Sequence, residues 1–470
     1  MEVTISHVAY GLFTLVIIGT MIFRKGVVLP TLLGTFVVAF TYKGSFIDAF
    51  IAIFQANVVA AQELFHIFLI IALMLALLQS LKEVGADRTM IQPFQKLMIN
   101  GHVSFFVLVG VTYVISLFFW PTPAVPLICS LLVPAAVRSG LPVTIAAVAV
   151  ALSGQGMALS SDYIIQVAPS LSAKAAGVDV DVVASQSLVL SLISGTLAMI
   201  IVYVLYRQKI RSVHDSRNDY ELQMMQTSKQ FIGKGEHHPL LRRLFAIVVP
   251  ITFFIVIIYM VYTKLLLGRM GGLEGGDGAA FIGGVAVILL MVTTVSFDGH
   301  QALHSISHYL TEGFVFAFQA MGPVIPIAGF FFLGSADFSS DILNTDQAPA
   351  FLFDLIQVTQ QYLPQTPLFA AFSILIIGMI TGLDGSGFSG LPLVGGLAAS
   401  LETSAMDAST LASIGQMGAI WTGGGTLVAW SSLIAIAGFC NISVMDLVRK
   451  NVIPVISGLT IATVAALFIF

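Results

Sequence analysis

Apolar segments about as long as a bilayer is thick recur along this whole chain, and they restrict the folds open to it. A helix needs roughly 20 mostly apolar residues to cross the hydrocarbon of a membrane. Only 9% of the 470 residues are charged, whereas a soluble domain carries charge on about a quarter of its residues. The sequence therefore predicts an all-helical, polytopic membrane protein with spans near residues 6–23, 27–42, 58–81, 103–120, 184–206, 245–264, 279–296, 313–334, 367–382 and 452–470.

One polar segment, residues 207–243, gives the expected orientation. It carries eight Lys and Arg residues against four acidic residues. Cytoplasmic loops are enriched in Lys and Arg, so we expect this loop to face the cytoplasm. Both termini would then lie outside, in what we expect to be the cytoplasmic membrane of a bacterium. The net charge of −4 is too small to indicate a nucleic-acid partner.

Two short matches relate the halves of the chain to each other. DAFIAIFQA at 48–56 resembles EGFVFAFQA at 312–320, and ALSGQGMALSS at 151–161 resembles ASIGQMGAIWT at 412–422. The offsets are 264 and 261 residues, so the matches are nearly collinear. The first span enters from outside and its counterpart after the loop enters from the cytoplasm. The sequence therefore predicts two inverted repeats.

Inverted repeats are typical of secondary transporters, whose sites lie near the midplane at the repeat interface. A channel or a structural membrane protein is the alternative interpretation. The expected organisation is a first repeat at 1–206 with a hairpin at 121–140 and a broken helix at 143–172, a cytoplasmic loop at 207–243, and a second repeat at 244–470 with a hairpin at 383–402 and a broken helix at 408–438.

Four chain breaks are the candidate binding positions. Three prolines in the Trp120–Pro126 segment cannot all continue a helix, so the chain must turn there. The polar segment 384–390 falls at the equivalent place in the second half, and each half has a further Gly-rich break. The residues we expect to bind the substrate or an ion are Pro123, Ser153, Gly154, Gln155, Gly156, Ser160, Ser161, Asp384, Gly385, Ser386, Gly387, Ser389, Gly415, Gln416, Thr422, Gly424 and Thr426.

The chemistry of these breaks suits an ion or an anionic solute. Unwound backbone would offer carbonyl oxygens to Na⁺, for example at Gly154, Asp384 and Gly415, and helix N-termini would attract an anion. The alternative is that these glycines only allow close helix packing. Asp384 could carry a proton or bind Na⁺, or it could cap a helix. We expect no cofactor other than a coupling ion, Na⁺ or H⁺.

Two other features are weaker indications. His300, His304 and His308 share one helix face and could bind a metal or sense pH, although a solvated amphipathic face explains them better. The chain has no phosphate-binding loop, nucleophile elbow or metalloprotease motif, so we expect it not to be an enzyme.

The Gly/Ser/Thr-rich breaks at 384–390 and 415–426 and the inverted halves resemble the ion transporter superfamily of secondary carriers. That group includes gluconate, citrate, dicarboxylate and lactate permeases and NhaC-type antiporters. The resemblance implies re-entrant hairpins, discontinuous helices, an elevator mechanism and a homodimer in the lipid bilayer. We expect a proton- or sodium-coupled symporter of a small organic anion such as a carboxylate. A sodium/proton or amino-acid antiporter, a channel, and a permease subunit of a multicomponent system remain open.

Overall fold

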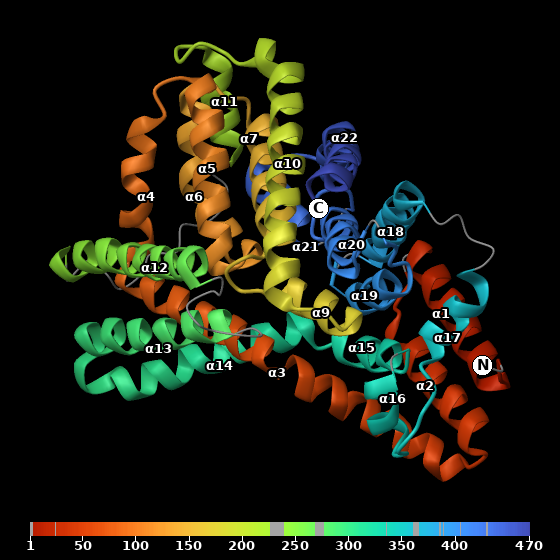
Figure 1. Ribbon diagram of the computed structural model, residues 1–470. Coiled ribbons are helices and arrows are strands. Elements are labelled where there is room, and N and C mark those ends of the chain that lie inside the picture. Colours follow the sequence, from red (N-terminus) through yellow and green to blue (C-terminus); the bar gives the residue numbers. More distant parts are fainter. Residues whose placement is uncertain are drawn as a thin grey trace.

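The protein is a bundle of helices whose architecture is seen in the computed structural model (Figure 1). The structure describes residues 3–470 apart from 24, 226–238, 268–276, 335, 361–365, 385–386, 389, 405 and 429–430. Within these residues every regular element is a helix, and six helices are long and apolar enough to span a membrane, or seven if one bent pair counts as a span. The expectation of an all-helical protein with several spans is confirmed.

The first half of the chain leads to the polar loop. Its elements are α1 (Ile5–Ile22), α2 (Val28–Lys43), α3 (Phe46–Val84), α4 (Ala86–Leu97), α5 (Gly101–Phe119), α6 (Pro121–Arg138), α7 (Val143–Val150), the π-helix η1 (Ala151–Ala158), α8 (Leu159–Ser161), α9 (Val167–Ala176) and α10 (Val180–Tyr206). The loop contains the 3-10 turn η2 (Arg207–Lys209) and α11 (Ser216–Met225).

The second half has a similar order of elements. They are α12 (Pro239–Leu267), α13 (Asp277–Asp298), η4 (Gly299–Gln301), α14 (Ala302–Met321), α15 (Val324–Phe332), α16 (Ala336–Leu343), α17 (Phe351–Gln360), α18 (Pro367–Thr381), η5 (Gly382–Asp384), α19 (Leu391–Ser400), α20 (Ala408–Gly423), α21 (Ser431–Cys440) and α22 (Val444–Ile469).

Capping residues set the ends of several helices. The side chains of Ser45, Asn100 and Asp407 accept hydrogen bonds from first-turn N–H groups of α3, α5 and α20, which satisfies donors that have no partner inside the helix. Gly85 ends α3 with a φ of 71°, a conformation that glycine adopts without a Cβ clash. The helices on either side of it are bent by 78°.

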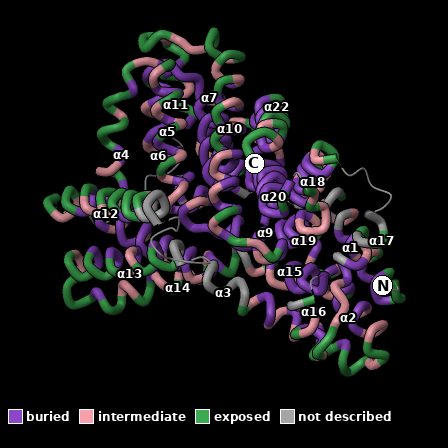
Figure 2. Tube along the Cα trace, viewed as in Figure 1, coloured by how far each residue is buried: buried purple, intermediate pink, exposed green. Residues whose placement is uncertain are grey.

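The helices form two layers (Figure 1). Long α3 runs along one side, packed against α2, α13, α14 and α15. The other layer contains α5 to α10 and α18 to α22, and at its centre α20 is buried over its full length (Figure 2). The segment from α7 through α8 is almost as completely buried. The two central helical segments are therefore screened from lipid by the helices around them.

The structure corrects three sequence predictions. The span expected at 313–334 is two helices, because Pro323 lacks the N–H that would continue α14 into α15. The backbone expected to unwind at 153–156 forms the π-helix η1, and Gly415 and Gln416 lie inside continuous α20. The helical structure is instead interrupted at 162–166 and 424–428.

Candidate functional site

The segment expected as the first hairpin, 121–140, is a single helix, α6, and the turn before it contacts the segment before α19. We call these two turns the hairpin tips. Helix α5 ends at Trp120, whose φ of 61° turns the chain so that Pro121 can begin α6. The Trp120 ring stacks on the Phe388 ring, which precedes α19, with ring centroids 5.3 Å apart. The Thr122 and Ser432 hydroxyls lie 2.8 Å apart and join the first turn of α6 to the first turn of α21. The tip of the first half therefore contacts two elements of the second.

Asp162 organises the break in the first half. Its φ of 37° ends α8, and its side chain is buried. One carboxylate oxygen accepts a hydrogen bond from the Ala168 N–H at 2.8 Å, and the Gln166 N–H donates to the Asp162 backbone carbonyl at 2.8 Å. The carboxylate thus satisfies the first turn of α9. In the second half the positive-φ residue after α20 is Gly425, with a φ of 114°.

The structure separates two glutamines that the sequence repeat makes equivalent. The Gln416 Oε1 accepts a hydrogen bond from the Ser172 hydroxyl at 3.1 Å, and its Nε2 donates to the Ser160 carbonyl at 2.9 Å. The Gln155 side chain is 0% exposed, and neither of its amide atoms has a hydrogen-bond partner among the described residues. Gln416 is satisfied inside the fold, whereas Gln155 is available to a bound molecule.

The Gln155 side chain lies at the first turn of α21. Its Cγ is 3.5 Å from the point where a side chain on Gly425 would begin, and the Leu433 N–H nitrogen is 3.4 Å from the same point. Nearby, the Thr426 hydroxyl donates to the Trp421 carbonyl. That carbonyl is the counterpart of the Ser160 carbonyl which Gln416 binds in the other half. Gln155 would donate to the Trp421 carbonyl if it matched Gln416, but the Thr426 hydroxyl donates to that carbonyl instead.

Other unpaired polar groups surround η1. Thr112 and Ser116 on α5 lie beside Gly154, so that a Cβ there would be 3.2 and 3.1 Å from their side chains. Buried orphaned groups of this kind require a partner such as a ligand or water. We call the following side chains, each with a buried polar atom unpaired within the described part of the chain, the polar centre: Thr112, Ser116, Gln155, Trp421 and Thr422.

Three of the predicted hydroxyls bond within the protein. Ser153 donates to the Ala149 carbonyl, Ser161 to the Ala158 carbonyl, and Ser160 to the Ser191 hydroxyl. The hydroxyl protons of these three serines are therefore already donated to contacts within a helix or between helices.

Most of the predicted glycines permit close packing, as the alternative interpretation expected. A methyl on Gly156 would overlap the Trp421 ring, and one on Gly415 would overlap Val394. Gly424 lies against the Gln155 carbonyl oxygen, so it brings α20 close to η1.

Five of the predicted binding residues lie outside the described residues, either entirely or in their side chains. This holds for Gly385, Ser386 and Ser389, and for the side chains of Asp384 and Pro123, whose backbones belong to η5 and α6. Gly387 is described and has a φ of 74°.

Sequence reasoning missed Thr112, Ser116 and Trp421. A signal was present, because Thr112 and Ser116 are spaced by one helical turn in an otherwise apolar span. Of the three histidines, His308 lies 3.3 Å from Glu312 on an exposed face of α14.

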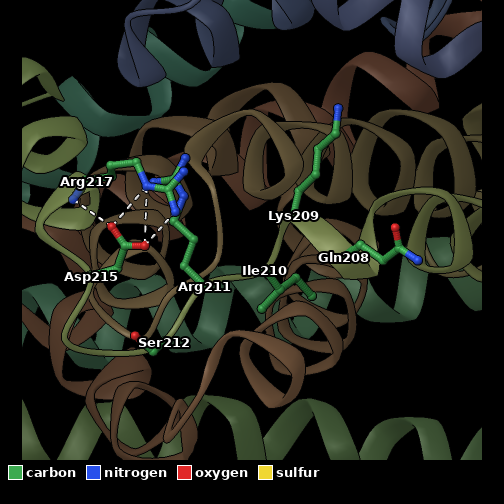
Figure 3. Close-up of a pocket in the computed structure, with 7 residues that line it drawn as sticks. All are labelled: Gln208, Lys209, Ile210, Arg211, Ser212, Asp215 and Arg217. Carbon is green, nitrogen blue, oxygen red and sulfur yellow. Dashed lines mark hydrogen bonds and ion pairs between the residues drawn. The ribbon is translucent and has the colours of Figure 1, made fainter.

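The loop after α10 forms a separate surface pocket (Figure 3). Arg217 donates hydrogen bonds to both oxygens of Asp215 and lowers the pKa of that carboxyl to about 2. Glu221 pairs with Arg211 at 2.7 Å and accepts a hydrogen bond from the Val143 N–H at 2.9 Å. The loop is thereby fixed to the N-terminus of α7.

Comparison with known proteins gives one clear relative. No family model matches the chain. The chain is 36% identical over 466 residues to the uncharacterized membrane protein YhfA of Bacillus subtilis (strain 168), covering 98% of this chain and 97% of that protein. A solved structure, the YdaH transporter of Alcanivorax borkumensis, is similar with a TM-score of 0.49 and 12% identity, covering 85% of each chain. That likeness is too distant to assign a function.

Proposed function

The chain belongs to the family of the membrane protein YhfA, and from that premise we propose that it is a secondary active transporter. The proposed activity is proton- or sodium-coupled symport of a small organic anion such as a carboxylate. The observation that carries the proposal is the polar centre, a set of buried and unpaired polar side chains on α5, η1 and α20 of a strongly apolar protein.

The energetic cost of the polar centre supports a binding role. A buried donor or acceptor without a partner costs about 1–3 kcal/mol. Gln155 alone has two such atoms, and four further side chains of the polar centre have one each. A solute with hydrogen-bonding groups would offset this cost, and a small polar solute is what a transporter of this architecture must bind near the midplane.

Helix pairing supports the inverted repeat on which transport would depend. Helix α9 packs on α19 and α6 packs on α21, so exchanging the halves converts one contact into the other. The contacts of α1 with α17 and of α12 with α4 exchange in the same way. We propose an elevator in which the layer of α5 to α10 and α18 to α22 moves against α3 and its neighbours, in a homodimer.

We further propose the orientation expected from charge, with the loop after α10 in the cytoplasm and both termini outside the cell membrane. The coupling ion would be Na⁺ or H⁺, with Asp384 as the residue that binds it. An antiporter for Na⁺ and H⁺ or for amino acids would share this architecture and differ only in the direction of the coupled flux.

The test is uptake by proteoliposomes that contain only this chain. A coupled transporter accumulates a carboxylate from a test panel when a Na⁺ or H⁺ gradient is imposed, and uptake collapses when an ionophore removes the gradient. Passive conduction would show a channel, and inactivity of the isolated chain with restored activity beside other subunits would show a permease component.

The Asp384→Asn variant tests the coupling residue. We expect binding of the solute without gradient-driven accumulation, because asparagine neither carries a proton nor provides a carboxylate for Na⁺. Full accumulation by this variant would exclude Asp384 from coupling.

A further inference from the structure

The N-termini of two helices meet at the hairpin tips. Thr122 and Ser432 are the second residues of α6 and α21, and their hydroxyls are 2.8 Å apart. The first turn of a helix carries a partial positive charge. Neither first turn contains an acidic residue, and α6 has no side-chain cap. Two positive helix ends in contact favour an anion beside them.

The other half of the molecule has a carboxyl group, that of Asp162, in the corresponding place. There α9 packs against α19, and the Asp162 carboxylate accepts a hydrogen bond from the first turn of α9. Residues 162 and 425 are 263 positions apart, between the two repeat offsets, and both have a positive φ. Gly425 has no side chain, so this position of the second half does not supply the carboxyl group that Asp162 supplies in the first.

Gln155 provides the independent second indication of a ligand. Its amide is fully buried and unpaired among the described residues, and its Cγ and the Leu433 N–H nitrogen, in the first turn of α21, lie 3.5 and 3.4 Å from the point where a side chain on Gly425 would begin. An amide nitrogen and backbone N–H groups are donors, which suits a carboxylate without a basic side chain.

We propose that a carboxylate group of the substrate binds at the first turn of α21, in the position that the Asp162 carboxylate takes at α9, with Gln155 donating to it. This inference rests on the proposed function and assigns the substrate's charged group to one place within it. It also makes the two halves chemically unequal. The pair α9 and α19 has a carboxyl group from the protein, that of Asp162, whereas the pair α6 and α21 would receive one from the substrate.

The experiment compares thermal unfolding of the purified full chain in sodium acetate, sodium chloride and acetamide at equal concentrations. We expect acetate to raise the melting temperature of the wild type, because a ligand of the native state stabilises it, and chloride and acetamide to have little effect. In Gln155→Glu the protein supplies its own carboxylate at α21. This variant should melt about 2 °C higher without ligand and lose the acetate effect.

Two variants serve as controls. Gln416→Glu should melt lower, since the amide donor to the Ser160 carbonyl is lost. Gln155→Met should fold and lose the acetate effect even if Gln155→Glu does not fold. The proposal is overturned if acetate stabilises the wild type no more than chloride, or if Gln155→Met retains the acetate effect. Gradient-driven uptake by wild-type proteoliposomes reports on the proposed function separately, so transport without acetate stabilisation would leave that function standing and remove this inference.

Discussion

Replacing each of the two central glutamines by methionine tests whether they differ as their hydrogen bonds indicate. Gln416→Met removes partners from the Ser172 hydroxyl and the Ser160 carbonyl. Each buried group left unpaired costs about 1–3 kcal/mol, so this variant should lose at least about 2 kcal/mol of unfolding free energy. Gln155→Met leaves no protein group unpaired and removes two orphaned atoms. Its ligand-free stability should be unchanged or higher, while its solute uptake should be lost.

The measurement is thermal and denaturant unfolding of both variants in the same detergent without substrate, followed by uptake in proteoliposomes. Methionine is close in length to glutamine, so the loss of the amide is the main change in both cases. Equal destabilisation by the two substitutions would refute the reasoning, because it would show that Gln155 has partners in the native protein. Normal uptake by Gln155→Met would separately exclude the residue from binding.

Three further predictions concern the layer of α5 to α10 and α18 to α22. Cys129 on α6 and Cys440 on α21 have buried thiols, and these two helices pack together. Bridging the thiols with a mercuric ion should therefore leave uptake unchanged, and inhibition that is absent in Cys129→Ala would contradict movement of these helices as one body. Gly378→Ala should lower the unfolding free energy by about 3 kcal/mol in a denaturant-unfolding assay, because its methyl would overlap a backbone oxygen of α20. Gly110→Ala is the control, and it should not destabilise the protein because a methyl there meets no other atom. Glu221→Ala should cost about 1 kcal/mol in that assay by uncapping α7, and an unchanged melting curve would show that the loop is not fixed there.

Much of the helical layout could be predicted from local signals. Trp120-Pro121 marks the end of α5, because proline has no N–H to continue the helix but suits the first turn of the next one. Pro323 gave the same signal between α14 and α15, and the sequence prediction passed over it because the flanking residues are uniformly apolar.

The binding site was less predictable because it depends on packing. Gln155 and Gln416 occupy equivalent positions in similar sequence segments, and only the three-dimensional contacts show that one is satisfied and the other is not. The glycines at 154 and 156 suggested unwound backbone, but close neighbours on α5 and α20 use them for helix contact. Composition alone does not distinguish these two uses of glycine.

The conformation of Trp120 has a consequence for the balance between states. A non-glycine residue at a φ of 61° and a ψ of 133° stores about 1–3 kcal/mol of backbone strain. The ring stack with Phe388 contributes about 0.5–1.5 kcal/mol, and the Thr122 to Ser432 hydrogen bond about the same. The backbone strain at Trp120 and the two contacts that hold this conformation are therefore of nearly equal magnitude. If the proposed solute binds beside this tip, the few kcal/mol of its binding exceed this difference and would decide which conformation of the tip is populated.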